Sequence, residues 1–173
     1  MTKKEFMNSV TNGQEDILQQ LFDLLDTMKI DYCVIGGLAV NAYVEPVVSL
    51  DLYLAVVAKK MDKLIKEAGK IFNIEKFPHS INLTSPKSDL RIQLQTDPRY
   101  QAFIPRASIK DVMGYKMNVA SVEDVLQGKI WAYSDEQRRK SKRQKDLADI
   151  YRLVEAYPYL KDLLPGSLKD TEF

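Results

Sequence analysis

The segment Gly36-Gly37-Leu38-Ala39-Val40-Asn41-Ala42 is followed by Ser49-Leu50-Asp51-Leu52-Tyr53-Leu54, with thirteen residues between Gly37 and Asp51. The apolar residues 32–35 in front of the glycines predict a short buried strand, and residues 38–43 predict a short helix that ends before Pro46. Residues 50–57 predict a second strand, on which Asp51 and Tyr53 share the face opposite the leucines. The segment therefore predicts two strands, joined through a glycine turn and a helix, with one carboxylate on the second strand.

The rest of the chain adds further strands and helices. Strands are predicted at residues 72–77, 79–84 and 90–95, and helices at residues 12–28 and 61–70, with Asn12 as the cap of the first helix. Two C-terminal helices are predicted at residues 121–136 and 141–156, opened by capping boxes at Ser121 and Ser141. We expect a single domain over residues 1–173 with an α/β (α+β) fold. A mixed central sheet flanked by helices would occupy about residues 12–110, and a helical part about residues 121–157.

The composition is that of an ordinary globular chain. Hydrophobic residues make up 45% and charged residues 28% of the 173 residues, and the net charge of +1 does not indicate a partner. No apolar run approaches the ~20 residues that cross a bilayer, and the basic N-terminus is not followed by the apolar run of a secretory signal. The single cysteine, Cys33, lies in an apolar run, which predicts a buried thiol in a reducing compartment. We therefore expect a cytoplasmic protein.

Positive charge is concentrated in one short run. Residues 138–145 carry six lysines and arginines, while the rest of the chain has 19 lysines and arginines against 24 acids. Such a run can neutralise phosphate groups, but a solvated junction between two helices also explains it. The sequence leaves both interpretations open.

The glycine turn and Asp51 suggest phosphate chemistry. Two glycines leading into a helix let backbone N–H groups approach an anion, because no side chain blocks the way. Two acids one residue apart on a neighbouring strand can hold Mg²⁺, which prefers carboxylate, water and phosphate oxygens. This chain has Asp51 as the first acid, but Tyr53 stands where the second is expected. A phenol is neutral at pH 7 and is a poor Mg²⁺ ligand.

The order of these motifs is similar to that of a known enzyme superfamily. The glycine segment, Ser49-Leu50-Asp51-Leu52, residues 119–129 and Lys145-Asp146-Leu147-Ala148-Asp149-Ile150 together resemble the DNA polymerase β-like nucleotidyltransferases, and among them the AbiEii-type abortive-infection toxins. The resemblance covers about residues 30–155 and implies a central sheet of the nucleotidyltransferase type. Such proteins commonly carry Arg-x-Thr-x-Asp-x-Asp after the glycines. Here Val47, Ser49, Asp51 and Tyr53 occupy those four positions.

The resemblance also implies roles for individual residues. Asp51 would bind the metal, and Gly36, Gly37 and Ser49 would hold the triphosphate. Lys129 and Lys145 would lie near the phosphates, with Lys129 also a catalytic residue. Gln93 aligns with the aspartate that acts as general base, which leaves Asp89 as the other candidate metal ligand. Tyr53, Gln93, Asp146 and Asp149 are expected around this site.

The residues themselves allow other interpretations of several positions. Lys129 lies on the core-facing side of its helix, where it could extend its ammonium group to the surface or reach a phosphate. Asp146 and Asp149 could pair with Lys142 and Lys145 on a solvated face. Asp89 follows Pro86-Lys87-Ser88 and could cap that turn. His79 has no second ligand at metal-binding spacing, and Trp131 is predicted to lie in the core.

Three functions remain open. The first is a nucleotidyltransferase-like protein with weak or absent Mg²⁺ binding, which binds a nucleotide or RNA phosphate without efficient catalysis. The second is an active Mg²⁺-dependent enzyme that transfers a nucleoside monophosphate from an NTP to a hydroxyl of RNA (such as tRNA) or protein. The third is a protein-interaction scaffold without a ligand. By resemblance an antitoxin protein is a possible partner, no membrane partner is expected, and the oligomeric state is open.

Overall fold

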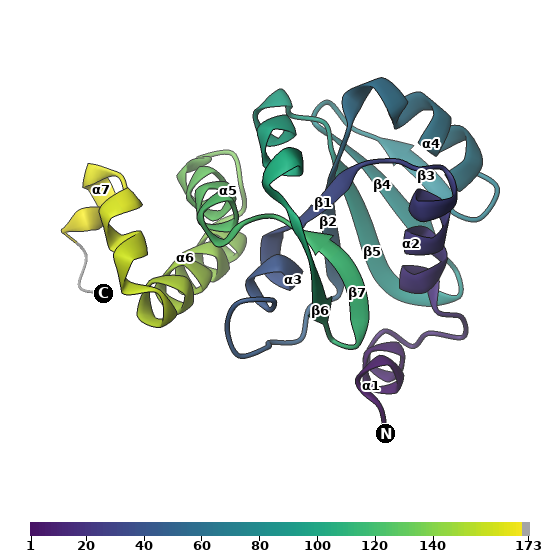
Figure 1. Ribbon diagram of the computed structural model, residues 1–173, viewed down its shortest axis with the longest axis horizontal. Helices are drawn as coiled ribbons and strands as arrows, with labels where there is room; N and C mark the ends of the chain where they lie inside the picture. Colours follow the sequence, from purple (N-terminus) through teal and green to yellow (C-terminus); the bar gives the residue numbers. More distant parts are fainter. Residues whose placement is uncertain (171–173) are drawn as a thin grey trace.

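The structure, a computed structural model, describes residues 1–170 (Figure 1). The helices are α1 (Lys3–Val10), α2 (Ile17–Thr27), α3 (Gly36–Val40), α4 (Met61–Ala68), α5 (Val122–Ser134), α6 (Lys140–Ala156) and α7 (Gly166–Lys169), with short 3-10 helices η1 (Ala58–Lys60), η2 (Pro98–Arg106) and η3 (Pro158–Leu163). The strands are β1 (Tyr32–Ile35), β2 (Asp51–Val56), β3 (Asn73–Lys76), β4 (Ser80–Ser85), β5 (Ser88–Gln95), β6 (Ser108–Val112) and β7 (Tyr115–Val119).

All of these strands form one mixed sheet, in the order β3-β4-β5-β2-β1-β7-β6. In its centre, β2 is antiparallel to β1 and parallel to β5, and β1 is parallel to β7. The outer pairs β3–β4, β4–β5 and β6–β7 are antiparallel. The predicted α/β fold with a mixed central sheet is therefore confirmed.

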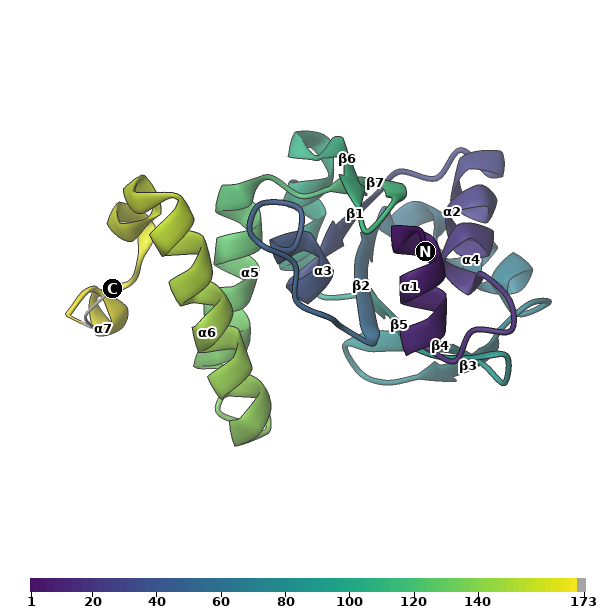
Figure 2. The same ribbon diagram turned by 90° about the horizontal axis from the view of Figure 1, so that it is seen from below.

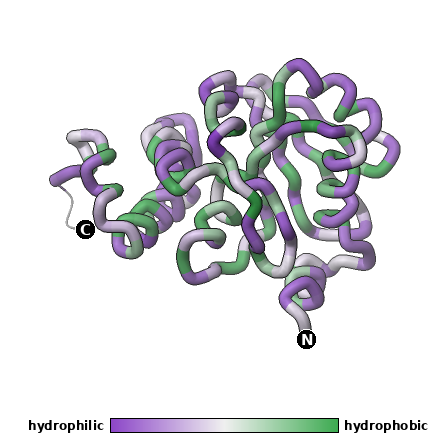
Figure 3. Tube along the Cα trace, in the orientation of Figure 1, coloured by the Kyte–Doolittle hydropathy of each residue, from purple (hydrophilic) through white to green (hydrophobic). Residues whose placement is uncertain are grey.

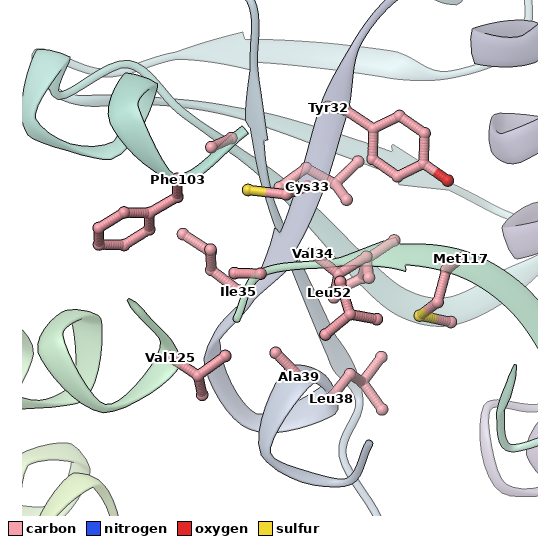
Figure 4. Close-up of a cluster of buried hydrophobic side chains, with 14 of the residues drawn as sticks. Tyr32, Cys33, Val34, Ile35, Leu38, Ala39, Leu52, Phe103, Met117 and Val125 are labelled. Atoms are coloured by element: carbon pink, nitrogen blue, oxygen red, sulfur yellow. The ribbon is translucent and has the colours of Figure 1, made fainter. Parts of the chain in front are cut away.

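The helices cover the sheet on both sides. Figures 1 and 2 show α2 and α4 on one side, and α3 on the other side between the sheet and the helices α5 and α6. Figure 4 shows Leu38 and Ala39 of α3 beside Val34 of β1 and Leu52 of β2, while Val125 of α5 points toward the same cluster. All five of these side chains are at most 1% exposed. Their burial holds the glycine turn, β2 and α5 in fixed positions relative to one another.

The two long C-terminal helices pack along each other as a hairpin. The trace of α6 alternates between hydrophobic and hydrophilic segments (Figure 3), and its apolar residues Ile150, Leu153 and Val154 are buried. α5 begins at the predicted cap, because the Ser121 hydroxyl accepts a hydrogen bond from the Asp124 N–H at 3.2 Å. The predicted cap at Ser141 is wrong, since α6 begins one residue earlier and has no side-chain cap.

The N-terminal part differs from the prediction. The helix α1 was not predicted from the sequence. Asn12 does not cap a helix but adopts a left-handed conformation (φ 49°) in the turn between α1 and α2. The cap of α2 is Asp16, whose carboxylate accepts a hydrogen bond from the Gln19 N–H at 3.1 Å. Both residues are good caps and turn formers, so the local sequence did not distinguish them.

A second unpredicted feature is the hairpin of β6 and β7. Its two-residue loop consists of Met113 and Gly114, with φ values of 54° and 86°. Two consecutive positive φ values are typical of the turn that best fits the twist of a two-residue hairpin.

Within residues 1–170, no helix is long and apolar enough to cross a membrane.

Candidate functional site

The glycine turn is shaped by its contact with Tyr53. Gly36 has a φ of 73°, and a Cβ atom on it would lie 2.9 Å from Cδ2 of Tyr53. Both the backbone conformation and the ring therefore require glycine at this position. Gly37 is more open, since a Cβ atom there would meet Ser49 Oγ at 3.8 Å as its nearest contact.

A cavity of about 60 Å³, here called the basic cavity, lies between the glycine turn, β2 and the α5–α6 hairpin. It brings together seven residues that the sequence predicted for the site: Gly37, Ser49, Asp51, Tyr53, Lys129, Lys145 and Asp146. Arg138 and Lys142 complete its lining. The cavity thus brings together residues from three distant parts of the chain, while their roles stay predictions.

An adjoining cavity of about 90 Å³ is also lined by Tyr53. It is lined by Gly36 and Gln93 among others, and shares Tyr53, Lys129, Arg138 and Asp146 with the basic cavity. Tyr53 and Gln93 are direct neighbours in the parallel pairing of β2 with β5. Burial, and then the charge of Asp51, raise the pKa of Tyr53, and this outweighs the lowering by Arg138, so its phenol is neutral at physiological pH.

Asp51 is held by an arginine that the site prediction did not include. Arg91 lies directly opposite Asp51 in the strand pairing, and its Nε donates a hydrogen bond to Asp51 Oδ1 at 2.7 Å. The backbone N–H of Asp51 donates to Ser49 Oγ at 3.2 Å. The hydroxyl of Ser49 thus positions the start of β2, and the carboxylate of Asp51 already has a cationic partner.

Lys129 lies at the centre of a buried charge network between α5 and α6. Its Nζ is 3.1 Å from Asp146 Oδ1 and 2.8 Å from Asp149 Oδ2, and its side chain is only 8% exposed. The second contact is an ion pair whose geometry does not suit a hydrogen bond. Arg138 donates from Nε to Asp146 Oδ2 at 2.7 Å, and Arg152 donates from Nη1 to Asp149 Oδ1 at 2.8 Å. Each buried carboxylate thus has two cationic partners.

This network corrects one interpretation of the sequence. A solvated helix face with Asp146 and Asp149 paired to Lys142 and Lys145 is wrong, because the two aspartates are 1% and 4% exposed and pair with other cations. Lys129 does not extend its ammonium group to the surface either. Its predicted role at a phosphate stays a prediction, although the residue does line both cavities.

Arg138 connects this network to the sheet. It belongs to the short connection between α5 and α6, and besides binding Asp146 it lines both cavities together with Tyr53. The run of six cations was the sequence signal for this residue, but not for its particular contacts. Arg91 could have been found only from the register of β5 against β2.

The residues present do not fit a two-metal site. The Asp89 carboxylate accepts a hydrogen bond from Asn12, and Asp89 does not line either of the two cavities. Tyr53 and Gln93 hold the other two positions at which the family pattern has acids. In the described part of the chain, no three His, Cys, Asp or Glu side chains are grouped so that they could hold a metal ion. Asp51 and the buried, ion-paired Asp146 offer too few free oxygen ligands for tight Mg²⁺ binding.

Trp131 lies in a cluster of aromatic and cationic side chains near this site. Its ring stacks on Phe103, with centroids 5.6 Å apart and planes 5° apart, and Arg99 lies 4.5 Å from the ring centroid. Trp131 packs against the core as predicted. His79 lies with Arg99, Asp97 and Gln95 around a larger polar cavity of about 440 Å³ that shares Arg138 with the basic cavity.

The fold is similar to that of solved nucleotidyltransferases. The antibiotic-resistance factor ANT(2″)-Ia, in complex with adenylyl-2″-tobramycin, superimposes with a TM-score of 0.61 at 14% identity, covering 85% of this chain and 92% of its own. The lincosamide antibiotic adenylyltransferase LnuA, with lincomycin bound, gives 0.57 at 15% identity, covering 82% and 98%. TM1012 of Thermotoga maritima, a candidate nucleotidyltransferase, gives 0.56 at 14% identity, covering 86% and 96%. At these identities the similarity shows the fold alone.

No curated protein matches the chain by sequence. A protein-family model, however, does match, and it is more specific than the similarity in fold. The family model that describes the nucleotidyl transferase AbiEii toxin of type IV toxin–antitoxin systems matches residues 47–171, which is more than half of the chain and confirms the resemblance inferred from the motifs. The chain therefore belongs to the AbiEii nucleotidyl transferase toxin family.

Proposed function

We propose that this protein binds the phosphates of a nucleotide or RNA in the basic cavity, with weak or absent nucleotidyl transfer. The observation that carries the proposal is the position of Lys142 and Lys145. Both lie near the start of α6 and line the cavity together with Gly37 and Ser49. Among residues 1–170 neither lysine forms an ion pair, so both ammonium groups are available to an anion.

The charges around the cavity support an anionic ligand. Asp51 is neutralised by Arg91, and the two carboxylates of the α5–α6 network are matched by Lys129, Arg138 and Arg152. The two lysines therefore leave a local excess of positive charge, which attracts phosphate. The basic run of the sequence thus contributes to a concave site as well as to the exposed surface.

The site offers little support for catalysis. A general base at the position of Gln93 would have to accept a proton from the attacking hydroxyl, and an amide cannot do so. The neutral phenol of Tyr53 cannot replace a carboxylate ligand. Loss of a general base alone commonly costs about 10²-fold or more in rate.

An active transferase is the second candidate, and it is favoured by Asp51. This carboxylate lines the cavity beside Gly37 and Ser49, where a transferred phosphoryl group would bind. The matched family is named for nucleotidyl transfer, and LnuA and ANT(2″)-Ia act on antibiotics. For this chain the acceptor would be a hydroxyl of RNA, such as tRNA, or of protein, and the name of the family suggests an antitoxin as protein partner.

The test is isothermal titration with ATP, GTP, CTP and UTP, each in Mg²⁺ and in EDTA. We expect binding that persists in EDTA and that weakens in Lys145→Gln, but not in Lys66→Gln, a matched exposed lysine on α4 on the other side of the sheet. Binding that requires Mg²⁺ would instead support the active enzyme, to be followed by transfer assays on tRNA. If no nucleotide binds, both proposals fail and a protein-interaction scaffold remains.

A further inference from the structure

Asp51 lines the basic cavity, and its ion-pair partner Arg91, which is not among the lining residues, lies next to it. The two residues are paired on neighbouring parallel strands, so their side chains leave the same face of the sheet. The Asp51 side chain is 20% exposed and lines the cavity, while the Arg91 side chain is 62% exposed. The cation closest to the one candidate metal-binding carboxylate is thus supplied by the protein itself.

The guanidinium of Arg91 has donors to spare. A guanidinium carries five N–H groups in a planar fork, and only Nε of Arg91 donates to a partner within residues 1–170. The two terminal nitrogens are therefore free to bind a second anion while Nε stays on Asp51. Planar forks of this kind suit phosphate oxygens, which they can bind through two parallel hydrogen bonds.

The neighbouring residues disfavour a divalent cation at the same place. Tyr53 contributes a neutral phenol, Gln93 an amide, and Arg138 a further positive charge beside the Tyr53 ring. A metal ion would meet the carboxylates of Asp51 and Asp146, both of which already have cationic partners. These residues therefore do not fit the metal site that the family pattern implies. In the Arg91–Asp51 pair, a guanidinium already provides the positive charge next to the carboxylate.

We propose that Arg91 takes the place of the metal ion, with its guanidinium bridging the Asp51 carboxylate and a phosphate group of the ligand. The inference rests on the proposed phosphate-binding function and specifies how that function works without a metal. It names a polyphosphate as the ligand chemistry and Arg91 as a binding residue. Phosphate binding should accordingly be independent of divalent cations.

The first test is isothermal titration with sodium triphosphate in EDTA and in Mg²⁺. The wild-type protein should bind equally or more weakly in Mg²⁺, because Mg²⁺ neutralises the free ligand. Arg91→Gln should weaken binding in EDTA by about three- to ten-fold, the effect of one exposed charge-assisted contact. The matched control is Arg99→Gln, since the Arg99–Asp97 pair has the same kind of geometry at 2.8 Å, with 54% and 21% exposure, and Asp97, unlike Asp51, does not line the basic cavity.

The outcomes separate the inference from the function on which it rests. If Lys145→Gln weakens triphosphate binding and Arg91→Gln does not, the bridging role is refuted and the phosphate site remains. If the wild-type protein does not bind triphosphate, both are refuted. A second measurement is Mn²⁺ binding by electron paramagnetic resonance without phosphate. We expect the wild-type protein to bind no Mn²⁺ at Asp51. If the wild-type protein binds an Mn²⁺ ion and Asp51→Asn abolishes this binding, the inference is overturned.

Discussion

Lys129→Met tests whether Lys129 serves the fold or the phosphate. The substitution keeps an unbranched side chain of similar length on α5 but removes the ammonium group between Asp146 and Asp149. Asp149 Oδ2 would then have no polar partner within the described residues, because it has no hydrogen bond and Lys129 is its only ion-pair partner. The variant thus leaves a buried carboxylate oxygen uncompensated, which is costly.

The size of the loss follows from what remains. Removing one partner of a buried ion pair commonly costs about 3–5 kcal/mol. Arg138 stays on Asp146 and Arg152 stays on Asp149, so both carboxylates keep one cation. We therefore expect a loss of about 3 kcal/mol, the lower end of that range, which corresponds to a decrease in melting temperature of about 6–12 °C for a chain of this size.

The assay is urea unfolding followed by circular dichroism, combined with triphosphate titration of the folded variant. The matched control is Lys145→Met, which changes an exposed lysine on the same cavity and should alter the free energy of unfolding by less than about 0.5 kcal/mol. We expect opposite patterns, with Lys129→Met losing stability and Lys145→Met losing triphosphate affinity. A Lys129→Met protein as stable as wild type that no longer binds triphosphate would refute our assignment of Lys129 to the α5–α6 network.

Three further substitutions or measurements test the fold around the site. Gly36→Ala should lower the free energy of unfolding by about 2 kcal/mol, from the positive φ and the contact with Tyr53, while Gly37→Ala should change it far less; equal losses in urea unfolding would contradict the geometry. Ser121→Ala should cost about 1 kcal/mol through loss of the cap of α5, and Ser141→Ala, in the exposed first turn of α6, should cost almost nothing. Burial raises the pKa of the Cys33 thiol from 9.0 to about 12, so its contribution to stability is complete below pH 9 and is lost as the pH rises toward 12. At pH 8 a thiol reagent should therefore modify Cys33 only as fast as the protein opens, and rapid labelling of the native protein would contradict its burial.

The central strands could be predicted because their signals are local. β1 is a short apolar run ended by glycine, and β2 alternates between buried leucines and half-buried Asp51 and Tyr53, which is the pattern of a strand with one covered face. β6 has no such signal, since all but its last residue, Val112, are at least partly exposed, and its turn with β7 uses Met113 instead of the usual asparagine or aspartate. An edge hairpin that buries little is therefore hard to recognise in a single sequence.

The charged residues of α6 show a different limit. Helical periodicity correctly placed Lys142, Lys145, Asp146 and Asp149 on one face, but it does not say what that face meets. In the fold, Asp146 and Asp149 on this face pack against α5, where they pair with Lys129. Lys142 and Lys145 line the basic cavity instead. The choice between a solvated face and a buried network depends on the packing of two helices, which the spacing within either helix cannot determine.

The pairing of β2 with β5 explains why the departures from the family pattern occur together. The register sets Asp51 against Arg91 and Tyr53 against Gln93, so two of the three expected acid positions are side by side, and the third carboxylate faces a cation. A metal site here would need changes on both strands, because an acid at position 53 would still lie beside an amide and next to the Arg91–Asp51 pair. The same register leaves hydrogen-bonding groups and a cation, Arg91, on the two strands, which supports the proposed binding of an anion without a metal. The residues on the two strands thus form one consistent arrangement, and this arrangement supports the proposed binding of phosphate without a metal.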